Sequence, residues 1–553
     1  MSLDAFLYDL HFDTDKAKPV DFEVDWEDAP HPYKLYRRLP AIPLCPEVPL
    51  TLEGRTSPTK PDLREFGHFL WYVCGLTQLS QTYLEDEVAE EHWFGPLQSC
   101  RRFIPSGGAM YPYELYVYLK MEDAPSGIYH YDVAHHRLVR LRSGNFDSYL
   151  ARALGDRCDI SACFGAAFVS SMYWKNFYKY NNFAYRLQGL DTGVMIGQLL
   201  EAAKRFGFEA GVRFQFLDRA VNHLLGLSEQ EESVYAVIPL SLSPISEWFT
   251  KPSRGGSGGS ISATELCREL TAVQHEHYVR SQRVLPFPML IKMNEASMME
   301  SMDTQDTRDT THTFDSLDTK NSAEISGVIQ NRIGSNRNWH DEGATITLPR
   351  GQRPPVDLAV ASQKRFSPER DFVLEKVGLE QLAALLHEAT ASFRYTNDLD
   401  GEEEESARVS LYGCFYQVEG VPDGAYRYDS TAHALRQLRP GDHRLWLQEG
   451  MALDNVNLFQ VPLCFHVGGD RDHLKTVLGY RGYRIQQMEA GMLVQRLLLA
   501  ASASGMGGHP LLGFDVSSCD ELYQIASQGK TCLIQIPTGP YRHRPKLEGS
   551  LRG

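Results

Sequence analysis

Lys179 and Tyr180 are the residues whose types and spacing most directly suggest chemistry. They are adjacent in MYWKNFYKYNNFAYR, an aromatic and basic run at 172–186. A lysine ammonium close to a phenol lowers the pKa of the phenol from about 10, so the pair could serve as a general base and its electrostatic partner. The same run also fits an aromatic core segment with solvated lysines, so its context must decide between the two interpretations.

A glycine-rich loop supplies a second candidate. The stretch RRFIPSGGAMYPYELYVYL at 101–119 contains two arginines, a Pro-Ser-Gly-Gly turn and an alternating apolar strand. Adjacent glycines let the backbone approach a ligand because no Cβ stands in the way, while Pro105 and Pro112 stiffen the two ends of the loop. We expect this loop to lie against a flat cofactor. The alternative is a surface turn ahead of a strand.

The elements that position these residues follow from the hydrophobic pattern. Residues 190–208 predict a long helix in which Gly193 and Gly197 share one face and permit close packing against another helix. The other expected elements are a helix at 63–76, two strands joined by a turn at 127–141, and buried strands at 166–171 and 233–240. The glycine-bearing helix directly follows the Lys179–Tyr180 pair in the chain.

The chain contains an internal repeat. GAYRYDSTAHAL from Gly424 matches GIYHYDVAHHRL from Gly127, 297 positions earlier. Farther along, RGYR and the helix at 488–506 repeat FAYR and the helix at 190–208 at almost the same offset. Several elements in one order at a nearly constant offset indicate a duplication of about 200 residues. The two halves are called copy one and copy two below.

The duplication divides the chain into four parts. The parts are an extended N-terminal segment (1–50), copy one (51–250), a linker (251–344) and copy two (345–553). Within the linker we expect a helix at 263–281 and a disordered stretch at 295–339. Lys34, Arg37 and Arg38 give the N-terminal segment a basic patch, which is either solvated or a contact for a peptide or phosphate.

Composition narrows the class of protein. At 553 residues the chain is too long for one ordinary domain, and its net charge of −16 argues against a nucleic-acid partner. It has no apolar run long enough for a membrane span, and acidic residues stand where a signal peptide would be basic. Ten cysteines without a CxxC pair are typical of reduced thiols and not of a zinc site. We therefore expect a cytoplasmic protein without a metal.

Three stretches carry a family resemblance. RRFIPSGGAMYPYELYVYL, GIYHYDVAHHRL and KYNNFAYRLQGLDTG together resemble the SagB-type dehydrogenases or azoline oxidases (ThcOx- and McbC-like), which are flavin-dependent members of the nitroreductase superfamily. The resemblance covers nearly all of 30–240 and is weaker over 345–550. It implies an α+β fold of two tandem nitroreductase-like domains, each a central antiparallel sheet flanked by helices. The two domains would form a pseudo-dimer within one chain.

The resemblance also implies a cofactor, a reaction and residue roles. FMN would lie between the two domains, with Pro105, Ser106 and Gly107 facing its ring. The enzyme would oxidise an azoline in a modified ribosomal peptide to an azole, as a base removes a proton and a hydride passes to flavin N5. Lys179 and Tyr180 would inherit the catalytic role.

Copy two differs from copy one in a complementary way. It has Val477 and Leu478 in place of Lys179 and Tyr180, and it has GEEEESARVSLYG in place of the glycine loop. The glutamates of that run would repel a flavin phosphate. Copy two retains other positions that the resemblance assigns to the cofactor: Arg365, Ser367 and Arg370 in RFSPER for phosphate, Gly513 and Phe514 near N5, and Arg542 and Arg544 after the last strand. A solvated basic tail is the alternative for the last two. We expect one FMN per chain and an empty second site.

Some features leave the substrate open. Phe183 and Val194 stand where the family usually has an arginine and a histidine. A small-molecule dehydrogenase, an NAD(P)H-dependent nitro or quinone reductase, and an inactive scaffold that binds a peptide or a partner all remain alternatives. A cyclodehydratase is a candidate partner, and chains could pair further into a homodimer.

Overall fold

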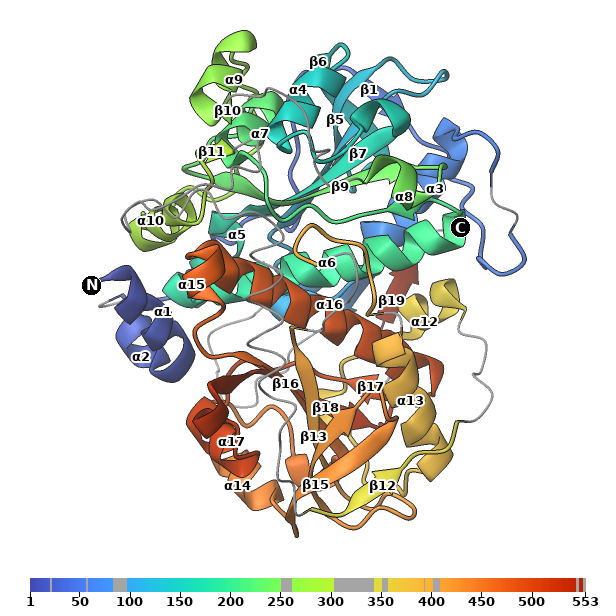
Figure 1. Cartoon of the computed structure of the whole chain (residues 1–553), viewed down its shortest axis with the longest axis vertical. Coiled ribbons are helices and arrows are strands. Elements are labelled where there is room, and N and C mark those ends of the chain that lie inside the picture. Colours follow the sequence, from blue (N-terminus) through green and yellow to red (C-terminus); the bar gives the residue numbers. More distant parts are fainter. Residues whose placement is uncertain are drawn as a thin grey trace, which may run out of the picture.

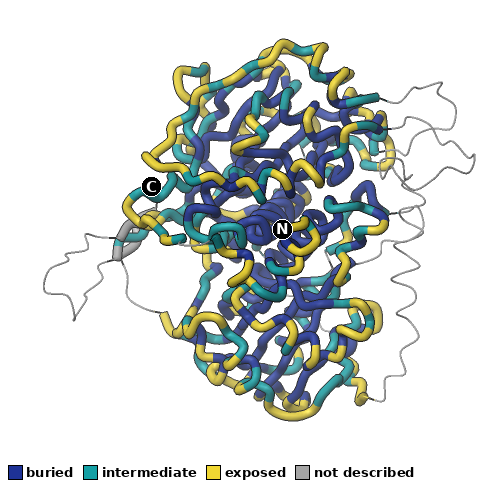
Figure 2. Tube along the Cα trace, turned by 90° about the vertical axis from the view of Figure 1, so that its left-hand side faces the viewer, coloured by how far each residue is buried: buried dark blue, intermediate teal, exposed yellow. Residues whose placement is uncertain are grey.

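The computed structural model describes residues 1–19, 22–55, 58–82, 97–249, 261–302, 343–350, 357–391, 393–400, 408–543 and 547–550. Two seven-stranded sheets lie on opposite sides of a central pair of long helices, one sheet in each copy (Figure 1). Figure 2 shows that the chain is most deeply buried around these central helices. The expected α+β fold, a pseudo-dimer within one chain, is confirmed.

The two sheets are antiparallel and have the same strand order. Copy one has the order β1-β6-β5-β4-β7-β9-β8, built from β1 (Ala41–Pro43), β4 (Tyr113–Leu119), β5 (Gly127–Asp132), β6 (Arg137–Ser143), β7 (Gly165–Met172), β8 (Glu209–Ala210) and β9 (Glu232–Ser241). Copy two has the order β12-β15-β14-β13-β16-β18-β17, built from β12 (Thr345–Thr347), β13 (Ser410–Phe415), β14 (Gly424–Asp429), β15 (Ala434–Pro440), β16 (Leu463–Asp470), β17 (Gly507–Gly508) and β18 (Lys530–Gly539). The hairpin and the two buried strands predicted for copy one are confirmed.

Most of the helices repeat as well. Copy one has α3 (Leu63–Cys74), α4 (Asp147–Ala153), α5 (Tyr173–Tyr180), α6 (Ala184–Phe206), α7 (Asp218–Leu225) and α8 (Ile245–Trp248). Copy two has α12 (Leu358–Lys364), α13 (Leu379–Ala391), α14 (Arg444–Glu449), α15 (Lys475–Leu478), α16 (Arg481–Ala503) and α17 (Val516–Leu522). Among the described residues, α8 and α12 are the exceptions to the repeat. Within the described residues, no helix combines the length and the hydrophobicity that a membrane crossing requires.

The central helices α6 and α16 meet through their glycines. A Cβ on Gly193 would overlap the carbonyl oxygen of Met488, and a Cβ on Gly491 would overlap that of Leu190. The predicted close packing at Gly193 is therefore confirmed, and the partner helix is its own repeat. The reciprocal contacts also fix the offset between the copies at 298 residues at this point.

The N-terminal segment corrects one prediction. Instead of running extended throughout, it begins with two helices, α1 (Leu3–Phe12) and α2 (Thr14–Ala17). Ser2 caps α1, because its hydroxyl accepts from the backbone N–H of Ala5. Phe6, Leu7 and Leu10 are buried on one face of this helix, and their helical spacing was a signal in the sequence.

Lys34 corrects a second prediction. It is neither solvated nor a phosphate contact, because its ammonium forms a buried ion pair with Glu232 at 2.6 Å. Arg37 and Arg38 are exposed, as expected for a solvated patch.

The linker differs from its prediction as well. Its helix α9 (Ala263–Glu269) ends earlier than expected, and a further helix, α10 (Pro288–Ala296), follows. The chain after α9 leaves the helix because it pairs with the N-terminal segment: Arg37 N–H donates to Glu276 O, and Tyr278 N–H donates to Leu35 O. Two short strands, β10 (Ile261–Ser262) and β11 (Ser301–Met302), pair beside α9. Most of the stretch expected to be disordered lies outside the described residues.

A small third sheet connects the two copies. Strand β19 (Leu547–Ser550), from the end of copy two, pairs with β2 (Leu76–Thr82), which pairs with β3 (Leu97–Arg102). Strand β3 leads directly into the glycine loop. The last strand of copy two therefore belongs to the same sheet as the strand that precedes this loop.

Candidate functional site

The glycine loop is held by a carboxylate from α6. Ser106 Oγ donates to Asp191 Oδ2 at 2.6 Å, and the N–H of Gly107 donates to Asp191 Oδ1 at 3.2 Å. Ser106 Oγ also accepts from the N–H of Tyr111 at 2.8 Å, which closes the loop. Burial raises the pKa of Asp191 to about 6, and these hydrogen bonds limit the rise. Sequence reasoning missed Asp191, although it lies in the LDTG run that carried the resemblance.

The loop brings Lys179 and Tyr180 together with the glycines. Gly108 has a φ of +61°, and a Cβ on it would lie 2.7 Å from Lys179 Nζ and closer still to Tyr180 Oη. Position 108 therefore requires glycine both for its backbone conformation and for space. The two predicted features, separated by about 70 residues in sequence, form one site, as expected for groups that act together.

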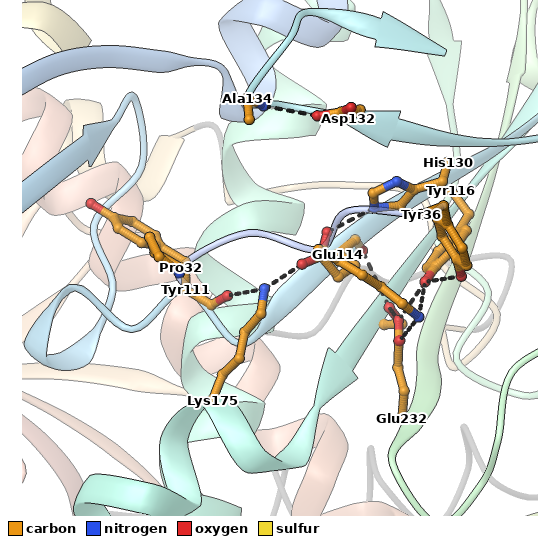
Figure 3. Close-up of polar contacts among 12 residues, drawn as sticks. Pro32, Tyr36, Tyr111, Glu114, Tyr116, His130, Asp132, Ala134, Lys175 and Glu232 are labelled. Atoms are coloured by element: carbon orange, nitrogen blue, oxygen red, sulfur yellow. Dashed lines mark hydrogen bonds and ion pairs between the residues drawn. The ribbon is translucent and has the colours of Figure 1, made fainter. Parts of the chain in front are cut away.

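Lys175 fixes the helix that carries the pair. It lies one turn before Lys179 on α5, and its buried ammonium donates to Tyr111 O at 3.2 Å and forms an ion pair with Glu114. Glu114 in turn accepts from His130 Nε2 at 2.9 Å (Figure 3). Lys175 and Lys179 thus bracket the loop, one at its end and one at its glycines.

Electrostatics in the site differ from the prediction. Burial lowers the pKa of Lys179 from its ordinary value of 10.5. The pKa of Tyr180 is raised and not lowered, because burial and the nearby Asp191 carboxylate both oppose the phenolate. The expected effect of the lysine on the phenol is therefore outweighed, and Lys179 is the group of the two whose pKa moves toward the physiological range.

Two arginines meet beside the loop without a carboxylate. Arg101 of β3 donates to the carbonyl oxygen of Arg365, and the Arg365 guanidinium lies near enough to the Tyr111 phenol for the two groups to interact electrostatically. The pKa of Arg365 is lowered to about 9, because of its burial and the charge of Arg101. Arg365 Nε is buried without a hydrogen-bond partner, and no carboxylate among the described residues forms an ion pair with either guanidinium. An anion would relieve this arrangement.

The remaining predicted phosphate residues differ in their exposure. Ser367 is half-buried, and Arg370 is exposed and donates to Asp454 O at 3.1 Å. Arg542 is exposed, and its backbone N–H donates to Asp371 O. Arg544 lies outside the described residues. The structure thus brings Arg365 next to the loop, whereas Arg370 and Arg542 are exposed.

Gly513 and Phe514 belong to copy two. Gly513 O accepts from the N–H of Ala452, and the Phe514 ring is buried 5.8 Å from the ring of His466. Among the hydrogen bonds and ring contacts of the described residues, none connects 513–514 to the glycine loop. The Phe514 side chain therefore packs the core of copy two.

The equivalent positions in the second pseudo-symmetric site form ion pairs with carboxylates or guanidiniums, although Arg55 Nε, like Arg365 Nε, is buried without a hydrogen-bond partner. Glu489, 298 residues after Asp191, forms a buried ion pair with Arg408. Arg55, the first arginine of the equivalent RTSPTK run, forms an ion pair with Glu65. The loop anchor and the phosphate position of this second site thus both have protein partners.

The nitroreductase family model matches residues 78–240 and 362–539, which together make up more than half of the chain. The chain belongs to the nitroreductase family and contains the family's domain twice. A crystal structure of a nitroreductase-like protein from Anabaena variabilis superposes with a TM-score of 0.68 at 21% identity, over 98% of this chain and 99% of that one. At this identity the likeness shows the fold, including its duplicated form.

Two curated relatives match shorter segments. The trifolitoxin-processing protein TfxB of Rhizobium leguminosarum bv. trifolii is 31% identical over 142 residues, which is 24% of this chain and 37% of TfxB. The nitroreductase-like protein MJ1384 of Methanocaldococcus jannaschii is 23% identical over 176 residues, which is 31% of this chain and 84% of MJ1384. This chain thus aligns with only about a third of the length of TfxB.

Proposed function

We propose that the chain is an FMN-dependent dehydrogenase of the SagB type, which oxidises an azoline in a modified peptide to an azole. The observation that carries the proposal is the cluster in which Lys179 and Tyr180 meet Gly108, while Arg365 of copy two, which forms no ion pair with a carboxylate of the described residues, lies beside the same loop. Copy one supplies the proposed base and the glycine loop, and copy two supplies the proposed anion position, so the site draws on both domains.

The residues present fit FMN. Arg365 and Arg101 offer guanidinium groups to its phosphate, and the loop of Ser106, Gly107 and Gly108 offers a backbone that a flat ring can approach. When bound, FMN would supply the acceptor for a hydride from the substrate. Asp191 holds the loop in place for this contact.

Lys179 is the proposed base. Burial shifts its equilibrium toward the neutral amine, which can take the proton from the azoline carbon. The electron pair of the broken C–H bond stays on the ring and forms the new ring double bond. The adjacent ring carbon loses its hydrogen as a hydride, which carries away two electrons. Tyr180 stays protonated because of its raised pKa, so its hydroxyl can donate a hydrogen bond to the ring nitrogen or to a carbonyl of the peptide.

The similarity to TfxB, which is named for the processing of trifolitoxin, supports a processing role over a reductive one. An NAD(P)H-dependent reductase remains the second candidate, and the assay below separates it. A partner such as a cyclodehydratase belongs to the same proposal, because an azoline must be formed before it is oxidised.

The test uses the purified full chain. We expect a yellow protein whose bound flavin is FMN, oxidation of a synthetic thiazoline-containing peptide to the thiazole by mass spectrometry, and no need for NAD(P)H. Lys179→Met should retain FMN and lose at least about a hundredfold in turnover. Lys475→Met, in the equivalent helix α15, should turn over normally. A colourless protein, or NAD(P)H oxidation without azole formation, would contradict the proposal.

A further inference from the structure

Residues 22–37 are called the strap, and the first part of this segment contacts α5. The ring of Phe22 meets Phe177 edge-on at 5.9 Å, and Trp26 meets Tyr178 edge-on at 6.4 Å. Both partners belong to the helix that ends in Lys179 and Tyr180. The strap therefore lies over the helix that carries the proposed base.

A buried ion pair holds one end of the strap. Lys34 reaches Glu232 at 2.6 Å and Tyr116 Oη at 3.1 Å, and Tyr36 lies 3.2 Å from the same phenol oxygen. Figure 3 shows Tyr36, Tyr116 and Glu232 meeting beside the Glu114–Lys175 pair. Separating such a buried pair is strongly unfavourable, so this end is fixed against strands β4 and β9.

A second anchor lies two residues after Trp26. The Asp28 carboxylate accepts from the backbone N–H groups of Gln282 at 2.6 Å and Arg283 at 2.9 Å. Together with the Phe22 contact, this anchor fixes the backbone on both sides of Trp26. The position of the indole thus follows from its neighbours.

Trp26 is nevertheless largely open to solvent. Its side chain is 62% exposed, although tryptophan is usually well buried. Lys179 Nζ lies 5.3 Å from the centroid of its ring, at a distance typical of a cation–π contact. The indole thus presents most of its surface to solvent immediately next to the proposed base.

We propose that Trp26 is a specificity-determining residue that contacts the ring of the substrate. The proposal rests on the proposed function, because it takes Lys179 as the group that reaches the substrate. A ring whose proton is within hydrogen-bond reach of Lys179 Nζ, about 3 Å, lies close enough to contact the indole. The ligand class is therefore a peptide with a planar five-membered heterocycle, since flat unsaturated rings pack well on an aromatic face.

The experiment compares kinetic constants of FMN-loaded variants with the thiazoline peptide. Trp26→Ala should raise KM about tenfold with kcat within about threefold of wild type, as expected when an aromatic anchor is lost. Trp26→Phe should recover most of the affinity, because a flat ring remains. The matched control is Phe459→Ala, which removes an exposed ring that lies 5.8 Å from Arg444 in copy two, and it should leave both constants unchanged.

Binding of the thiazole product peptide gives a readout without turnover. The peptide should quench tryptophan fluorescence in wild type, and Trp26→Phe should abolish most of the quenching while thermal melts confirm folding. An unchanged KM in Trp26→Ala would overturn the inference. A fall in kcat together with a shifted pH profile of kcat would also overturn it, because that result would mean that Trp26 only shields Lys179. Failure of wild type to bind the product peptide would overturn it too. Absence of FMN would instead reject the proposed function.

Discussion

The two pseudo-symmetric sites of this chain have the same scaffold and different polar partners. In the first, Asp191 holds the glycine loop and Arg365 has no carboxylate partner among the described residues. In the second, Glu489 is paired with Arg408, and Arg55 is paired with Glu65. Unsatisfied buried charge is unfavourable, so a fold retains it where a ligand completes the pairing. We propose that, after the duplication, one site stayed open for an anion and the other closed.

Gly108→Ala should have the largest effect. Alanine at φ +61° is strained by about 1 kcal/mol, and its Cβ would collide with Lys179 and Tyr180, so the loop must move. We expect at least about a hundredfold loss of kcat/KM, because such small displacements disrupt positioning. The control is Gly529→Ala, because Gly529 of copy two has the same left-handed conformation, φ +66°, and no atom within 4 Å of its Cβ. Equal losses in both variants would mean that backbone strain alone matters.

Arg365→Gln should weaken FMN binding by about ten- to a hundredfold, the range for a lost charge-assisted hydrogen bond. The flavin-free protein should become no less stable, because the buried guanidinium that is removed forms no ion pair within the described part of the chain. Arg55→Gln is the copy-one counterpart and should leave FMN affinity unchanged. FMN titration monitored by flavin fluorescence measures both. If Arg55→Gln were the variant that lost affinity, the assignment of open and closed sites would be reversed.

Asp191→Asn should change the pH dependence of stability and not the chemistry of the site. The pKa of Asp191 is raised to about 6 from 3.8, so the folded state binds this proton more tightly than the unfolded chain. Its stabilisation is complete below about pH 4 and is lost as the pH rises through 6, on the order of 3 kcal/mol. The flavin-free variant should lack this loss.

Chemical denaturation of wild type and Asp191→Asn at pH 4 and pH 7 measures the difference. A parallel pH dependence in the two proteins would show that the carboxylate is not destabilised by burial. Glu489→Gln serves as the copy-two comparison for FMN binding, which it should not alter.

Much of the scaffold could be predicted from the sequence, because local patterns determine it. The hairpin at 127–141, the strand at 166–171 and the glycine-bearing helix all follow from periodicity, and the duplication follows from Gly127 and Gly424. The long helix begins six residues earlier than expected, at Ala184, because a short 3-10 turn after α5 leads straight into it.

The polar partners could not be predicted in the same way. Lys34 pairs with Glu232, 198 residues away, and Asp191 holds a loop 85 residues before it. Such contacts depend on how the elements pack, and nothing local in the sequence marks them. The prediction that the pKa of Tyr180 is lowered was wrong for the same reason, because the burial that raises this pKa is a property of the packed fold.

Flavin stoichiometry tests most simply whether FMN binds at one of the two pseudo-symmetric sites and not at the other. The purified chain is saturated with FMN, freed of excess, and analysed by native mass spectrometry together with flavin absorbance per chain. We expect one FMN per chain, and we expect Arg365→Gln to lower this number while Arg55→Gln does not. Two FMN per chain, or a single FMN lost only in Arg55→Gln, would contradict this expectation.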